Sequence, residues 1–202
     1  MRAVIQRVSN ASVVVGDEVV SSIGRGICVL LGISKDDTTN DIKYMVKKIL
    51  NLRVFEDGGG KRWNKGVMDK DLEVLCVSQF TLTCTMKGHK PDFRSSMGAD
   101  QSESFYNDFL KHMKDTYKPE KIKDGRFGAY MQVHIQNDGP VTIQLDSPSS
   151  ENTTTKVKKS DNKTEEKQSA THSDCSSVDA EHATQGIDTS LSKTTNEKLN
   201  LS

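Results

Sequence analysis

Ile27-Cys28-Val29-Leu30-Leu31 is the stretch that decides the fold of this chain. All five residues are apolar, and Gly24-Arg25-Gly26 interrupts the chain just before them. A short apolar run bounded by glycine is typical of a strand with both faces buried. Leu72–Gln79 forms a second strong strand pattern further along. The sequence therefore predicts a sheet with a buried centre.

Two helical patterns and several shorter strand patterns surround these central strands. Thr38 and Asp41 form a capping pair before apolar residues at helical spacing, and Asp100 with Glu103 begins a second helix. The apolar stripe of the second helix, which includes Phe105, is expected to pack into the core. Further strands are expected over residues 3–8, 12–15, 19–23, 52–55, 130–136 and 141–145. This order predicts an α+β fold, with a mixed or antiparallel, barrel-like sheet and two main helices.

The composition divides the chain into a foldable part and a tail. No Phe, Tyr or Trp occurs from Ser147 onward, where Ser, Thr, Lys, Glu, Asp and Asn dominate. Such a segment buries too little apolar surface to offset the entropy lost on ordering. We expect a folded domain over residues 1–147 and a disordered, low-complexity polar tail over 148–202. The 202 residues carry 28 basic and 28 acidic side chains, so any RNA contact must come from a local patch.

Cysteine placement and the N-terminus predict a cytoplasmic protein, with the nucleus left open. Cys28 and Cys76 lie inside apolar runs, and no CxxC pattern is present. Buried free thiols fit a reducing compartment. Charged residues interrupt residues 1–7, so neither a signal peptide nor membrane association is expected. The histidines at 89, 112 and 134 form no pair with metal-ligand spacing, so neither a metal nor another cofactor is predicted.

Ser78-Gln79-Phe80-Thr81-Leu82 is the first candidate functional segment. A buried strand ends there in polar residues, and a strand end leaves backbone N–H groups without partners in the sheet. Such groups can stabilise an oxyanion. Thr81 could be a nucleophile, but the sequence offers no adjacent base. A strand that simply ends in a turn remains the alternative.

Asn137-Asp138-Gly139-Pro140-Val141-Thr142 is the second candidate segment. Pro140 fixes its own φ, and Gly139 tolerates angles that side chains exclude, so this backbone could aim its carbonyl groups at a ligand. Alone, the segment is more typical of a hairpin turn than of a ligand site. Arg7, in the N-terminal strand, could brace an irregular loop through its five N–H donors.

Two further segments place basic residues around an aromatic ring. Lys61, Arg62 and Lys65 surround Trp63, and a basic loop over 87–92 precedes Phe93. This arrangement suits a nucleic-acid backbone with a stacked base. A solvated loop with a hydrophobic anchor is the competing interpretation.

The two candidate segments together resemble the D-aminoacyl-tRNA deacylase family, also known as the D-tyrosyl-tRNA deacylase family. The resemblance rests on SQFTL at 78–82 and NDGPVT at 137–142, in this order. The opening MRAVIQRV at 1–8 and KPDF at 90–93 are similar to the same family. The resemblance extends from Met1 to about Leu145 and does not include the tail.

The resemblance implies a homodimer with active sites at the subunit interface. The Gly139-Pro140 bond is expected to be cis and to reach into the pocket of the other subunit. There its carbonyl groups would hold the amino group of a D-aminoacyl moiety and exclude an L side chain sterically. The implied catalytic residues are Phe80 and Thr81. The implied substrate-binding residues are Ser78, Gln79, Gly139, Pro140 and Arg7.

The implied activity is hydrolysis of the ester bond in D-aminoacyl-tRNA, with glycyl-tRNA left open as a further substrate. The backbone N–H groups near Phe80 and Thr81 would stabilise the oxyanion, and the terminal ribose hydroxyl would orient the water. A mechanism with Thr81 as nucleophile stays open beside this one. A non-catalytic RNA- or DNA-binding module that uses the basic loops and the tail is the alternative function, and a dimeric structural protein is a third. The sequence leaves open the preferred D-amino acids and the role of the tail.

Overall fold

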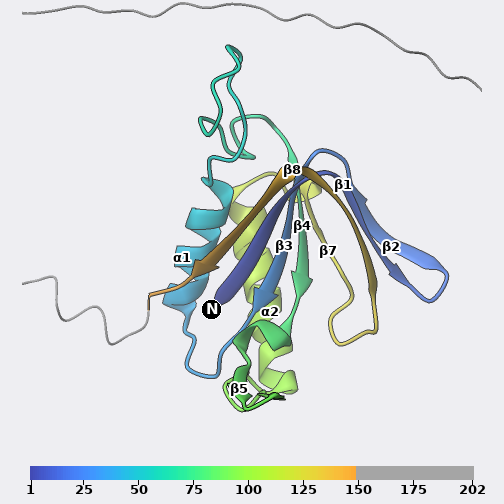
Figure 1. Ribbon diagram of the computed structural model, residues 1–202, viewed down its shortest axis with the longest axis vertical. Coiled ribbons are helices and arrows are strands. Elements are labelled where there is room, and N and C mark those ends of the chain that lie inside the picture. Colours follow the sequence, from blue (N-terminus) through green and yellow to red (C-terminus); the bar gives the residue numbers. More distant parts are fainter. Residues whose placement is uncertain (149–202) are drawn as a thin grey trace, which may run out of the picture. The chain divides into compact units, whose positions relative to one another are not determined.

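The computed structural model describes residues 1–148, which form a mixed β-sheet with two covering helices (Figure 1). Residues 149–202 of the predicted tail lie outside the described residues. The strands are β1 (Arg2–Val15), β2 (Glu18–Ile23), β3 (Gly26–Gly32), β4 (Glu73–Ser78), β5 (Thr85–Lys87), β6 (Lys90–Asp92), β7 (Ile122–Asp124) and β8 (Gln132–Asp146). The helices are α1 (Thr39–Leu50) and α2 (Ala99–Thr116), with short 3-10 helices η1 (Phe80–Thr83) and η2 (Pro119–Lys121).

The main sheet has the order β2-β1-β3-β4-β7, and β8 pairs with the other edge of the long strand β1. β3 pairs with β4 and β4 with β7 in parallel, whereas β1 is antiparallel to β2, β3 and β8. The hydroxyl of Ser21 in β2 donates a 2.7 Å hydrogen bond to the carbonyl of Asp124 in β7. The two ends of the strand order therefore meet. The predicted α+β fold with a mixed, barrel-like sheet is confirmed.

The central strands are buried on both faces, as their apolar sequence predicts. Ile27, Val29 and Leu31 of β3 pack in the core that α1 and α2 cover. Cys28, between them, lies in a second apolar cluster on the opposite face, with Leu75 and Val77 of β4. Successive side chains of a strand point to opposite faces, so a continuous apolar run is needed where both faces are covered.

Both helices form where their sequence patterns place them. The N–H of Thr38 donates to the Asp41 carboxylate at 2.8 Å, which confirms the predicted cap of α1. The α1 residues Ile42, Met45, Val46, Ile49 and Leu50 are all buried. The stripe of α2 also packs in the core, with Phe109 and Met113 fully buried and Phe105 partly so.

Three local predictions are wrong. Residues 52–55 form no strand, because only Phe55 makes a bridge there, to Lys65. The segment over 87–92 is not an open loop, since β5 and β6 pair within it as a hairpin. The Asn137–Pro140 segment does not reverse the chain: both halves of β8 pair with β1, so the two strands expected there form one irregular strand.

Candidate active site

The first candidate segment lies at the carboxyl end of the parallel strands. Ser78 pairs with Leu31, and the N–H of Gln79 donates to the Leu31 carbonyl at 2.8 Å. The chain then leaves the sheet and winds into η1 over Phe80–Thr83. Gly32 makes this possible, because a Cβ there would lie 2.9 Å from the Leu82 Cβ and 3.1 Å from the Gln79 carbonyl oxygen. The short helix η1 therefore packs directly on the end of β3.

The backbone N–H groups of Phe80 and Thr81 lie at this end of the sheet. Neither donates a hydrogen bond to any group within residues 1–148. They begin a short helix, where the first N–H groups have no acceptor inside the helix. Two adjacent unpaired donors can hold one developing negative charge.

The orientation of the Thr81 N–H is fixed from the far side of its peptide plane. The Phe80 carbonyl, which shares this plane, accepts hydrogen bonds from the Thr83 hydroxyl at 2.8 Å and the Ser96 hydroxyl at 3.2 Å. Thr83 is buried, and its hydroxyl also contacts that of Ser96 at 2.6 Å. Sequence reasoning missed both residues, because Ser96 reaches η1 only through the tertiary fold.

The side chains of the first segment provide an exposed aromatic surface, and none of them is a general base. Phe80 is 58% exposed, and its ring meets the Phe93 ring edge-on, with centroids 5.1 Å apart. The Thr81 hydroxyl accepts a hydrogen bond from the Gln79 amide. Within residues 1–148 no carboxylate or imidazole forms a hydrogen bond with this hydroxyl. A threonine nucleophile needs such a base, so the geometry favours the backbone role.

The second candidate segment is a bulge in the middle of β8. Gln6 of β1 pairs with Thr142 and Val8 pairs with Asn137, so the four residues 138–141 lie opposite Arg7 alone. Gly139 and Pro140 are exposed on this bulge, and the peptide bond between them is cis, as the sequence resemblance implies.

Arg7 holds the bulge in place. Its Nε donates to the Asp138 carbonyl at 3.1 Å and lies 3.2 Å from the Asp138 carboxylate. Its Nη1 donates to the Val54 carbonyl at 2.6 Å, which ties the bulge to the segment after α1. Gly139 has φ +121°, and a Cβ there would lie 2.9 Å from Arg7 Nη2. Any residue other than glycine at position 139 would displace either the bulge backbone or the guanidinium.

Within one chain, the two candidate segments lie at opposite ends of the sheet (Figure 1). Ser78 is level with Leu31 and Ala3, whereas the bulge is level with Arg7, four residues further along β1. Four residues span about 13 Å along a strand, and β1 lies two strand spacings, about 10 Å, from β4. The structure therefore groups Ser78, Gln79, Phe80 and Thr81 at one end. It groups Arg7, Gly139 and Pro140 at the other.

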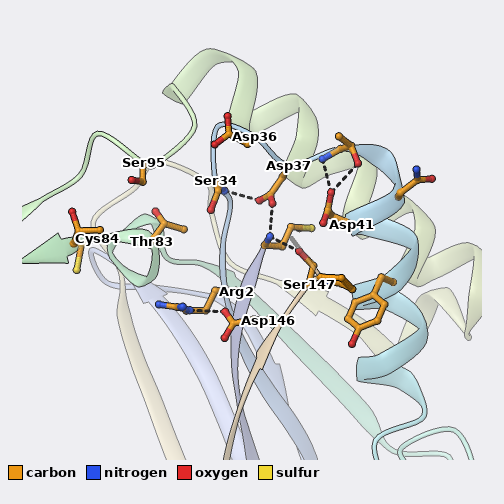
Figure 2. Close-up of a pocket in the computed structure, with 16 residues that line it drawn as sticks. Arg2, Ser34, Asp36, Asp37, Asp41, Thr83, Cys84, Ser95, Asp146 and Ser147 are labelled. Carbon is orange, nitrogen blue, oxygen red and sulfur yellow. Dashed lines mark hydrogen bonds and ion pairs between the residues drawn. The ribbon is translucent and has the colours of Figure 1, made fainter. Parts of the chain in front are cut away.

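A cavity of about 1140 Å³ adjoins η1 (Figure 2). Thr83 and Cys84 line its wall, and Arg2 joins η1 to β8 by donating to the Leu82 carbonyl at 3.3 Å and to the Asp146 carboxylate at 2.6 Å. Three of its acidic residues, Asp37, Asp41 and Asp146, are already engaged in the fold. Asp37 binds the ammonium group of Met1 and accepts the Ser34 N–H at 2.6 Å. These contacts support the end of the sheet beside the first segment.

The titratable groups of the core are unsuited to catalysis. Burial raises the pKa of the Cys28 thiol to about 12 and raises that of Cys76 as well, so both thiols stay protonated at neutral pH. Burial also raises the pKa of Asp37, although the Met1 ammonium and the Ser34 N–H act in the opposite direction. Residues 1–148 contain no cluster of His, Cys, Asp and Glu suited to a metal ion. None of the helices in this part of the chain has the length and hydrophobicity to cross a membrane.

Comparison with known proteins assigns the chain to a family. The family model described as D-Tyr-tRNA(Tyr) deacylase matches residues 4–146. Human D-aminoacyl-tRNA deacylase 1 is 67% identical over 148 residues, which cover 73% of this chain and 71% of the human protein. The Drosophila melanogaster D-aminoacyl-tRNA deacylase is 58% identical over 159 residues, covering 79% of this chain and all of that protein.

Two solved structures are similar to the chain as well. One is titled c-Myc DNA Unwinding Element Binding Protein, with 66% identity, a TM-score of 0.72 and coverage of 74% of this chain and 100% of that one. The other, a probable eukaryotic D-amino acid tRNA deacylase, has 17% identity and a TM-score of 0.64, covers 72% of this chain and 98% of its own, and shares the fold. The family match over residues 4–146 and the high identity of its members lead to one conclusion: this chain belongs to the D-Tyr-tRNA(Tyr) deacylase family.

Proposed function

We propose that this chain hydrolyses the ester bond of D-aminoacyl-tRNA and spares the L-aminoacyl form. The observation that carries the proposal is the pair of unpaired N–H donors at Phe80 and Thr81, in a chain 67% identical to a D-aminoacyl-tRNA deacylase. An aminoacyl ester is already activated, so a site that positions water and stabilises the oxyanion is sufficient. Water adds to the carbonyl carbon, and the tetrahedral intermediate then expels the ribose oxygen. The products are the free D-amino acid and the tRNA with its terminal hydroxyl restored.

In this mechanism Phe80 and Thr81 act through their backbone. Their N–H groups hold the carbonyl oxygen as it becomes negative, and the Phe80 carbonyl fixes the peptide plane through Thr83 and Ser96. Ser78 and Gln79 carry this turn at the end of β4. A ribose hydroxyl of the substrate orients the attacking water, because no side-chain base contacts Thr81 within residues 1–148.

The complete site requires a second copy of the chain. Selection of the D-form needs acceptors for the substrate ammonium group, and the exposed carbonyl groups of the Gly139-Pro140 bulge suit this role. These groups lie at the far end of the sheet from Phe80 in the same chain, since the neighbouring positions Ser78 and Arg7 are already about 16 Å apart by strand geometry. The chain therefore acts as a homodimer, in which the bulge of one subunit enters the site of the other. Dilution should lower the specific activity in step with loss of the dimer.

Selectivity then follows from the rigidity of the bulge. Arg7 fixes Asp138, and any Cβ at position 139 would lie 2.9 Å from the guanidinium. With the ammonium group bound to the bulge carbonyl groups, an L side chain would point into this backbone, while a D side chain would point away. Glycine has no side chain to exclude, so glycyl-tRNA is a candidate second substrate. The buried thiols Cys28 and Cys76 fit a reducing compartment such as the cytoplasm, where tRNA is used.

Ester hydrolysis tests this proposal directly. One tRNA is charged with the D-form and the L-form of the same amino acid and with glycine, and the loss of each ester is followed with purified full-length protein. We expect rapid hydrolysis of the D-ester and negligible hydrolysis of the L-ester. Equal rates on the D- and L-esters would sink the proposal, and tRNA binding without hydrolysis would favour the alternative of a nucleic-acid-binding module.

A further inference from the structure

The loop over residues 57–66, here called the Trp63 loop, is a rigid part of the surface. The Asp57 carboxylate accepts hydrogen bonds from the N–H groups of Gly59 and Lys61, both at 2.9 Å, and from the Asn64 amide at 2.7 Å. These bonds, led by the Lys61 N–H, lower the pKa of Asp57. The N–H of Asn64 also donates to the carbonyl of the buried Phe55 at 3.0 Å. Both ends of the loop are therefore fixed.

This rigid loop displays Trp63 to solvent. Trp63 is 55% exposed and belongs to neither apolar cluster, so the interpretation as a hydrophobic anchor is wrong. Trp63 has φ +60°, a conformation that bulky residues rarely adopt. Lys61 and Arg62 are exposed beside it and form no ion pair with any residue among 1–148. An exposed indole next to two unpaired cations suits a nucleic-acid strand, whose bases stack on rings and whose phosphates bind cations.

The position of the loop connects it to the substrate. Arg7 contacts both the Asp138 carbonyl in the bulge and the Val54 carbonyl just before the Trp63 loop. The segment after α1 and the bend of β8 lie at the same end of the sheet (Figure 1). In the proposed dimer, the bulge enters the partner's site and brings the Trp63 loop with it. This step rests on the proposed function.

We propose that the Trp63 loop binds the single-stranded 3′ region of the aminoacylated tRNA whose ester lies in the partner subunit's site. Trp63 stacks on an unpaired base, and Lys61 and Arg62 bind neighbouring phosphates. Stacking of one base on an aromatic ring typically changes the affinity by about 5-fold to 150-fold. Each phosphate contact to a single strand adds about 0.7 to the slope of log affinity against log salt.

Trp63 is the sole tryptophan of the chain, so its fluorescence reports directly on this loop. Titration of the full-length protein with uncharged tRNA should quench the emission, and this readout is independent of catalysis. Trp63→Ala should lower kcat/KM for D-aminoacyl-tRNA at least 5-fold, mainly through KM, while Trp63→Phe retains most of it. Neither variant should change the hydrolysis of a D-aminoacyl-adenosine ester, which lacks the preceding nucleotides.

The charges are tested by Lys61→Ala/Arg62→Ala, which should reduce the salt slope of tRNA binding by about 1.4. Lys111→Ala is the matched control, because Lys111 is exposed on α2 and paired with Asp115, and its slope should not change. Unquenched Trp63 fluorescence in saturating tRNA would overturn the inference. So would an equal loss of activity on the tRNA and adenosine esters. Quenching by tRNA without any ester hydrolysis would support this surface and refute the proposed activity.

Discussion

Replacement of Gly139 by alanine tests how the bulge selects its substrate. The new Cβ would lie 2.9 Å from Arg7 Nη2 and 3.0 Å from Val141 Cγ2, at a residue with φ +121°. An alanine in such a backbone region costs about 1–3 kcal/mol, and loss of the Arg7 bond to the Asp138 carbonyl adds about 1 kcal/mol. Because Gly139 is exposed, we expect the bulge to shift rather than the domain to unfold.

If the whole 2–4 kcal/mol is lost from transition-state binding, kcat/KM for D-aminoacyl-tRNA falls by about 30-fold to 1000-fold. Single-turnover deacylation measures this fall, while thermal unfolding and size-exclusion chromatography monitor fold and assembly. Gly16→Ala is the matched control, since Gly16 has φ +62° and a Cβ there meets nothing within 4 Å. Wild-type kcat/KM in a folded Gly139→Ala variant would refute the role assigned to the bulge.

Three further predictions follow from the same structure. Thr81→Ala should keep kcat/KM within about 10-fold, because the N–H donor remains, whereas loss of a true nucleophile costs several orders of magnitude in a deacylation assay. A chain ending at Ser150 should stay folded, dimeric and active, and a large fall in kcat on this truncation would place the domain boundary elsewhere. The pKa of Glu56 is lowered from 4.5 to about 2, foremost by Lys70 and then by the Glu56 backbone and Arg25. The stabilising contribution of the Glu56 carboxylate is therefore complete above pH 4.5 and is lost as the pH falls toward 2. Acid unfolding of Glu56→Gln should accordingly depend less steeply on pH in this window, and an unchanged profile would contradict the ion pairs.

The parts of the fold with a strong sequence period could be predicted. The apolar run at 27–31 and the helical spacing from Ile42 onward reflect burial, which the sequence records residue by residue. The β5–β6 hairpin was missed because its Lys-Gly-His-Lys centre carries no apolar alternation. Residues 52–55 look like a strand, but Phe55 is buried by packing and not by a sheet partner.

The candidate site shows the same limit of prediction from sequence. The chemistry of Phe80 and Thr81 could be proposed from a strand end, yet the groups that orient them, Thr83 and Ser96, are brought together only by the fold. Gly139 and Pro140 look like a turn locally. They form a bulge because the residues on both sides pair with β1, more than a hundred positions earlier in the chain. Local propensity cannot record such a distant partner.

The separation of Phe80 from Gly139 within one chain also has a genetic consequence. In the proposed dimer, each site takes its oxyanion donors from one copy and its selective bulge from the other. A copy defective at Gly139 and a copy defective in the turn at Phe80 would each be inactive alone. Together they form a heterodimer in which one site combines two intact halves and the other combines two damaged ones. Two alleles of this kind should therefore complement each other, although both lesions lie in the same domain.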